Sequence, residues 1–173
     1  LVELDQWLTI GRWARDVNAV MPEITDHGIS IKSGRHLLID GTPDPVDYGL
    51  GNCADKGDRQ SIALLTGANS GGKTTMLELL AHCTILAHMG LPVPAKAAKI
   101  GRVESLHVLA KAGGTQSAGA LEQTLLQLAE VVSNDDSKLI LADELEAITE
   151  PGAGARIIAG MLEAAESHAG TCM

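Results

Sequence analysis

The stretch Gly67-Ala-Asn-Ser-Gly-Gly-Lys-Thr-Thr75 decides the fold that we expect for this chain. It fits the pattern G-x-x-x-x-G-K-[ST], in which a glycine-rich loop surrounds phosphate groups. Residues 61–66, just before it, form an apolar run of strand length, and a long apolar run of helix-forming residues begins at Met76. A strand, a glycine loop and a helix in this order are the context in which the pattern forms a phosphate site.

Each residue type in this phosphate loop (residues 67–75) has a chemical role. Gly67, Gly71 and Gly72 allow the backbone to curl around an anion with its N–H groups pointing inward. The helix that starts near Lys73 adds partial positive charge. Lys73 supplies a full charge for the β- and γ-phosphates, and the Thr74 hydroxyl is the expected Mg²⁺ ligand. The other expected contacts to the nucleotide are Ala68, Asn69, Ser70 and Thr75. A glycine-rich turn with a surface lysine is the alternative, and the flanking strand and helix disfavour it.

Size and charge narrow the class of protein. A chain of 173 residues can bury one good core. The net charge of −9 argues against this segment being the main nucleic-acid surface, which would need clustered Lys and Arg. Residues 76–95 have the length of a membrane span, but His82 and Pro92 within them favour a buried helix. The three cysteines follow no zinc spacing, which predicts reduced thiols in the cytoplasm.

The spacing of apolar and turn-forming residues predicts alternating helices and strands. Helices are expected at residues 2–17, 73–89, 121–132 and 155–167. Strands are expected at residues 29–39, 61–66, 103–109 and 139–144. Residues 41–58, rich in Gly, Pro, Asp and Asn, are expected to form a loop. This order predicts an α/β fold with a mainly parallel central sheet flanked by helices.

Two carboxylates end the last expected strand. Asp143 is placed to hold Mg²⁺ through water, and Glu144 is placed to act as general base, or polariser, of the water that attacks the γ-phosphate. A strand end that meets solvent and happens to be acidic is the alternative. The phosphate loop earlier in the chain favours the catalytic interpretation.

These stretches, with two others, resemble the ATPase domain of MutS proteins. The resemblance lies in residues 66–75, in Gly90-Leu-Pro-Val-Pro-Ala95 and in Leu139-Ile-Leu-Ala-Asp-Glu-Leu145. Ile31-Lys-Ser-Gly-Arg-His36 is similar to the family's G-R-H-P strand, with Leu37 where Pro is usual. The stretch at 90–95, together with Glu150-Pro151, makes the chain resemble archaeal MutS-related proteins and the second bacterial MutS type more than the mismatch-reading enzymes.

The resemblance implies a P-loop NTPase of the ABC type that binds ATP and Mg²⁺, hydrolyses ATP and forms a homodimer through composite ATP sites. Residues 1–20 would be the end of a lever helix, and residues 21–173 would be the ATPase domain, truncated at its C-terminus. DNA would be bound by domains outside this segment, with no membrane contact and a nucleoid-associated place in the cytoplasm. The segment alone is expected to be inactive or weak as an ATPase.

The resemblance also implies two further site residues. Ser117, followed by Glu122 at the family's spacing, would complete the ATP site of the partner subunit, although Ala118-Gly119 replaces the family's Thr-Phe. An ordinary N-cap serine is the alternative. Tyr48 is the candidate for stacking on adenine, but Val46 could hold that position, and Tyr48 could be a surface-loop residue. Glu146-Ala-Ile148 departs from the family's pattern at a turn that crosses the dimer.

Two other functions are open at this point. The altered turn at residues 146–148 is compatible with a nucleotide-binding dimerisation platform that hydrolyses little ATP. Another P-loop enzyme, such as a small-molecule kinase, would usually need a cluster of arginines, and the arginines of this chain are scattered.

Overall fold

The computed structural model describes residues 2–41, 43–51, 60–68, 71–109, 126, 129–133, 136–143, 151–167 and 171–173. Two compact units divide the chain. The first comprises Leu1–Gln60 with Ala68–Arg102, and the second comprises Ser61–Gly67 with Val103–Met173.

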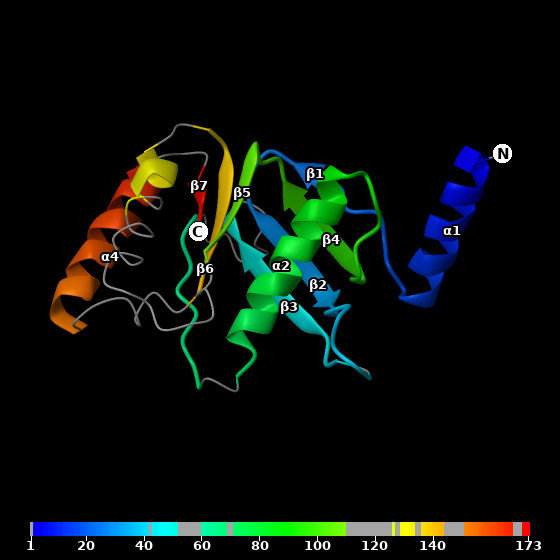
Figure 1. Cartoon of the computed structure of the whole chain (residues 1–173), viewed down its shortest axis with the longest axis horizontal. Helices are drawn as coiled ribbons and strands as arrows, with labels where there is room; N and C mark the ends of the chain where they lie inside the picture. Colours follow the sequence, from blue (N-terminus) through cyan, green and yellow to red (C-terminus); the bar gives the residue numbers. More distant parts are fainter. Residues whose placement is uncertain are drawn as a thin grey trace. The chain divides into compact units, whose positions relative to one another are not determined.

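The first unit is built on a four-stranded sheet with the order β1-β4-β2-β3 (Figure 1). Its strands are β1 (Glu23–Thr25), β4 (Ala97–Gly101), β2 (Ile29–Gly34) and β3 (Val46–Leu50). β1 and β4 are parallel, whereas β2 is antiparallel to both β4 and β3. The pairing of β2 with β3 shifts register between Ile31 and Gly34, and Ser33 there has a φ of 50°. β2 continues through this irregularity and ends at Gly34, five residues before the expected end at Ile39.

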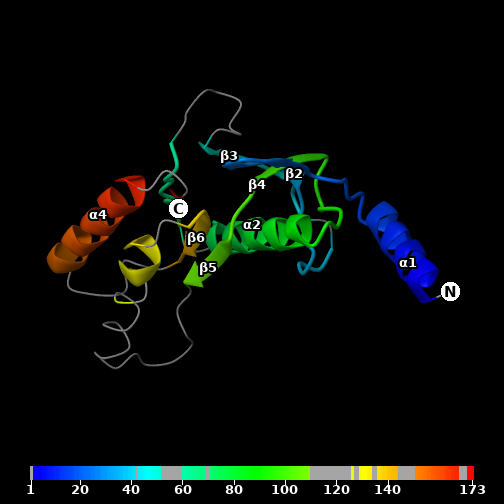
Figure 2. The ribbon, with the colours of Figure 1, turned by 90° about the horizontal axis from the view of Figure 1, so that it is seen from above.

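One face of this sheet is covered by α2 (Lys73–His88), as Figures 1 and 2 show. Ile29, Ile31 and Ile100 are at most 2% exposed, and each such buried side chain stabilises the fold by about 1.5–3 kcal/mol. The packing is close, because a Cβ added to Gly34 would stand 2.6 Å from Ile31 and 3.1 Å from Leu79 of α2. The helix is therefore seated directly on the sheet.

The first unit also contains α1 (Val2–Asp16), which has no buried residue. Leu4, Trp7 and Leu8 are 59%, 60% and 50% exposed. The helix ends where Asn18 takes a positive φ of 52° and the Ala19 N–H donates to Ala14 O at 2.7 Å. The helix expected at residues 2–17 is confirmed to within one residue.

The second unit holds an all-parallel sheet with the order β5-β6-β7. Its strands are β5 (Ser105–Leu109), β6 (Lys138–Ala142) and β7 (Thr171–Cys172). Residues 61–63 extend this sheet, because the Met173 N–H donates to Ser61 O and the Ala63 N–H donates to Met173 O, both at 2.8 Å. In parallel strands, a residue donates a hydrogen bond to residue i−1 of the neighbouring strand and accepts one from residue i+1 of the same neighbour. The segment that leads into the phosphate loop therefore runs parallel to β7.

Helices supply the other half of this unit's core. Ile140 of β6 packs with Val132 and with Ala165 of α4 (Pro151–Ser167), and all three are at most 1% exposed. Residues 129–133 are helical, in agreement with the helix expected at 121–132, whose first half lies outside the described residues. Lys138 is 1% exposed, and its Nζ donates to Val131 O at 2.7 Å, which satisfies a buried charge at the end of that helix.

A mixed α/β fold is confirmed, but several expectations about its elements were wrong. The strand expected at residues 61–66 does not form over that length, because residues 61–63 pair with Met173 whereas residues 64–66 are irregular and exposed. Parallel pairing dominates only the second unit, whereas the first sheet is mixed. Residues 41–58 are not one loop, because β3 occupies residues 46–50. The last helix begins at Pro151 rather than at residue 155, since proline is well tolerated in a first helical turn. Among the helices that the structure describes, none combines the length and the apolar character that a bilayer crossing requires.

Candidate phosphate-binding site

The described part of the phosphate loop turns back on the Ala68 carbonyl. Ala68 O accepts a hydrogen bond from the Gly71 N–H at 2.8 Å and another from Lys73 Nζ at 2.9 Å. The lysine side chain therefore lies over the turn instead of extending into solvent. This brings the ammonium group close to the loop backbone. That the loop amides surround an anion there stays a prediction. Asn69 and Ser70 lie outside the described residues, and Gly67 belongs to the second unit.

Two glycines are required by the geometry of this turn. Gly72 has a φ of 75°, a left-handed conformation that other residues adopt at a cost of about 1–2 kcal/mol. A Cβ on Gly71 would stand 2.9 Å from Ala68 O, which is closer than real Cβ contacts. The reason expected from the sequence, that glycine permits a tight backbone curl, therefore holds at both positions.

The start of α2 has the properties of an anion site. Gly72 is its N-cap, and because glycine has no side chain it forms no side-chain cap bond. Met76 N–H donates to Gly72 O at 2.9 Å, which is the first bond of the helix. The first turn carries no acidic residue, and Lys73 opens it. The amides of a first turn and the helix dipole favour a negatively charged group at this point.

Asp143 lies directly after β6, in the second unit. Its N–H donates to Leu109 O at 2.8 Å, so it continues the pairing with β5, and its side chain is half-buried. β6, β7 and residues 61–63 are all parallel, so their carboxyl ends meet at one edge of this sheet. Asp143 and the residues that enter the phosphate loop therefore leave the sheet at the same edge, where α/β proteins bind ligands. Glu144 lies outside the described residues.

The remaining predicted site residues lie in different parts of the chain. Thr74 is exposed and Thr75 is half-buried in the first turn of α2. Tyr48 lies in β3, opposite Ile31, and is half-buried. The alternative that it is a surface-loop residue was wrong, because the chain forms a strand there. Ser117 lies outside the described residues, so its role stays a prediction.

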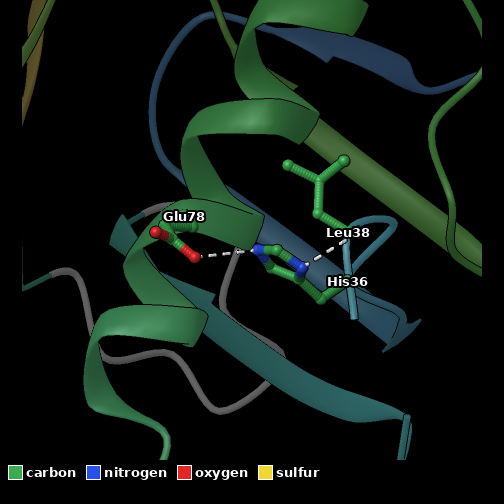
Figure 3. Close-up of polar contacts among 3 residues, drawn as sticks. All are labelled: His36, Leu38 and Glu78. Carbon is green, nitrogen blue, oxygen red and sulfur yellow. Dashed lines mark hydrogen bonds and ion pairs between the residues drawn. The ribbon is translucent and has the colours of Figure 1, made fainter. Parts of the chain in front are cut away.

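One contact near the loop was not predicted. His36 lies just beyond β2, and its Nε2 is 3.1 Å from Oε2 of Glu78 on α2 (Figure 3). The sequence signal was present, since His36 ends the stretch that resembles the family's G-R-H-P strand. No pattern of spacing links it to Glu78, because the two residues meet only when the sheet and the helix pack.

The cysteine of α2 has no chemical role in this geometry. Burial raises the pKa of Cys83 from 9.0 to about 12. A thiol with this pKa stays protonated at neutral pH and is neither a nucleophile nor a metal ligand. Cys83 is therefore a packing residue of the helix.

The fold and the loop define an α/β protein with a glycine-rich phosphate loop at the start of a buried helix. The family model for MutS domain V, the ATPase domain of MutS proteins, matches residues 63–172, and the chain belongs to this family. This confirms the family expected from the sequence.

Several curated relatives carry MutS2 names. The chain is 42% identical over 166 residues to "DNA-binding protein MutS2" of Pyrococcus furiosus, covering 94% of this chain and 29% of that protein. It is 34% identical over 173 residues to "Endonuclease MutS2" of Halalkalibacterium halodurans, covering 94% of this chain and 21% of that protein. "Putative endonuclease MutS2" of Bacillus subtilis is 33% identical over 172 residues, with coverage of 94% and 21%. The chain thus spans less than a third of the length of these relatives.

Proposed function

We propose that this chain is the ATP-binding and ATP-hydrolysing domain of a MutS-like DNA repair or recombination protein. ATP binding would close a homodimer through composite sites, and other domains would convert that closure into a change in DNA binding. The observation that carries the proposal is the phosphate loop, closed at Ala68 by Gly71 and Lys73, at the start of α2 in a member of the MutS domain V family.

Each residue of the site has a proposed task. The Gly71 and Gly72 amides and Lys73 Nζ bind the β- and γ-phosphates. Thr74 and Asp143 supply the oxygen ligands that Mg²⁺ prefers, and Mg²⁺ would neutralise phosphate charge there. Glu144 orients and deprotonates the attacking water. Ser117 of the partner subunit and Tyr48 would contact the γ-phosphate and the adenine.

Nucleotide binding is tested by titrating the full-length protein with ATP and Mg²⁺ in a calorimeter. Lys73→Ala removes a charged hydrogen-bond donor, which is worth about 1.5–3 kcal/mol, so we expect a loss of about 10- to 100-fold in affinity. Lys96→Ala, which removes an exposed lysine of the same unit, is the control and should bind ATP normally. Equal losses in the two variants, or no binding by the wild type, would refute the assignment of the phosphate loop.

Hydrolysis is tested separately, with Glu144→Gln. This variant should keep its ATP affinity and lose about 10²–10⁴-fold in turnover, because it removes the group that activates water. Phosphate release measured over time reports the effect, and turnover at the wild-type rate would remove Glu144 from the mechanism. ATP binding without hydrolysis by the wild type would favour the dimerisation platform instead.

A further inference from the structure

His36 contacts the helix of the phosphate loop from a segment far away in the sequence (Figure 3). Its side chain is 6% exposed, its Nε2 is 3.1 Å from Oε2 of Glu78, and its ring centroid is 5.2 Å from that of His82. Thr74, Glu78 and His82 are spaced four residues apart and therefore lie along one stripe of α2. His36 thus packs against the stripe that begins with Thr74.

The hydrogen bonds of the imidazole define its tautomer. The Leu38 N–H donates to His36 Nδ1 at 3.2 Å, so Nδ1 is an acceptor, and the proton of the neutral ring is on Nε2, which faces Glu78. The Nε2 atom is within reach of the carboxylate, but the approach falls outside good hydrogen-bond angles, and Nε2 is a buried atom without a hydrogen bond. A protonated Nε2 cannot bind a metal, so the geometry describes a contact between side chains instead of a metal site.

The backbone beside His36 is also hydrogen-bonded to the segment that follows α2. The Arg35 N–H donates to Pro94 O at 2.8 Å, and the Lys96 N–H donates to Lys32 O at 2.9 Å. Residues 94–96 follow α2 after the short turn at Gly90. The segment that follows α2 therefore holds the backbone beside His36, while the ring of His36 contacts the middle of the helix at Glu78 and His82.

We propose that His36 is a positioning residue for the ATP site, an inference that rests on the function proposed above. By contacting Glu78 and His82 it sets the rotation of α2 about its axis and hence the place of the Thr74 hydroxyl. A side-chain atom about 5 Å from a helix axis moves by about 1 Å when the helix rotates by about 10°. A misplacement of about 1 Å at a reacting centre lowers the reaction rate on the order of 10²-fold. A Mg²⁺ ligand is also sensitive to position, because the ion requires near-ideal octahedral geometry. The Mg²⁺-dependent part of ATP binding should therefore depend on His36.

The experiment measures ATP affinity of the full-length protein by calorimetry, once with Mg²⁺ and once with EDTA. His36→Asn keeps an acceptor for the Leu38 N–H but loses the donor that faces Glu78, and Glu78→Ala removes the carboxylate from an exposed position. We expect both variants to lose about 10-fold or more of the affinity gained from Mg²⁺, with a smaller loss in EDTA, where Lys73 and the loop amides hold the phosphates without the ion. His36→Gln places an N–H near the position of Nε2 and should lose less. His27→Asn, at an exposed turn, is the matched control.

The other possible results would overturn either the positioning role of His36 or the proposed ATP-binding function. An unchanged Mg²⁺ effect in His36→Asn and Glu78→Ala overturns the positioning role. Equal losses with Mg²⁺ and with EDTA also overturn it, because they indicate general damage to the fold. If His36→Asn does not fold, Glu78→Ala decides, because Glu78 has a side chain that is 54% exposed. A wild-type protein that binds no ATP in either buffer refutes the proposed function instead.

Discussion

Gly72 makes the turn of the phosphate loop possible, because its φ of 75° strains any residue with a Cβ. We expect Gly72→Ala to lower the free energy of unfolding by about 1–2 kcal/mol and to weaken ATP binding, since the turn must open to relieve the strain. Urea denaturation and ATP titration measure the two effects. Gly11→Ala in α1, where an added Cβ meets nothing within 4 Å, is the control and should raise stability by about 0.5–1 kcal/mol. Two variants of equal stability would contradict the strain argument.

The burial of Cys83 predicts that the stability of the fold depends on pH. Its pKa is about 12 in the folded protein and 9.0 when the thiol is exposed, so the folded state favours the neutral thiol. The unfolded state loses this proton first, and the stabilisation present below pH 9 is lost as the pH rises from 9 towards 12. We expect the free energy of unfolding to fall more steeply above pH 9 in the wild type than in Cys83→Ala. Parallel curves from urea denaturation at several pH values would show that Cys83 does not titrate in this way.

Strands and helices of the second unit depend on one small core. Ile140 of β6 is 1% exposed and packs against Val132 and Ala165. Ile140→Ala should lower the free energy of unfolding by about 2–5 kcal/mol, because it leaves a cavity between β6 and α4. Ile24→Ala in β1, where the side chain is 42% exposed, is the matched control and should cost less. Similar urea midpoints for the two variants would mean that this core contributes little.

Helices and strands whose apolar residues recur at a regular spacing were predictable from the sequence, whereas the short strands of the first sheet were not. α1, α2, β5 and β6 appear where the pattern indicated, with ends that differ by one or two residues. β1 and β4 were missed because β1 has three residues and β4 is the alanine- and glycine-rich run Ala97-Ala-Lys-Ile-Gly101. β3 was missed because Gly49 and the surrounding Pro and Asp indicate a loop. These strands form because neighbouring strands accept their hydrogen bonds, which local sequence does not report.

At the level of the assembled protein, the ATP site is expected to need two copies of the chain. We predict that ATP and Mg²⁺ shift full-length Glu144→Gln towards a dimer, because the bound triphosphate would be held between the phosphate loop of one subunit and Ser117 of the partner subunit. Light scattering with and without ATP measures the shift, with Lys73→Ala as the variant that should not respond. A response equal in both variants would show that the site does not control assembly.

The sequence by itself determined the family, and it predicted the phosphate loop and the acidic end of a buried strand. It could do so because residues 67–75 and 139–143 are short continuous stretches whose chemistry depends on order and spacing. Only the tertiary structure decided that the first sheet is mixed, that Tyr48 is part of a strand, and that His36 reaches Glu78 of α2. These features are contacts between segments distant along the chain, and packing and cross-strand hydrogen bonds set them, not local propensity.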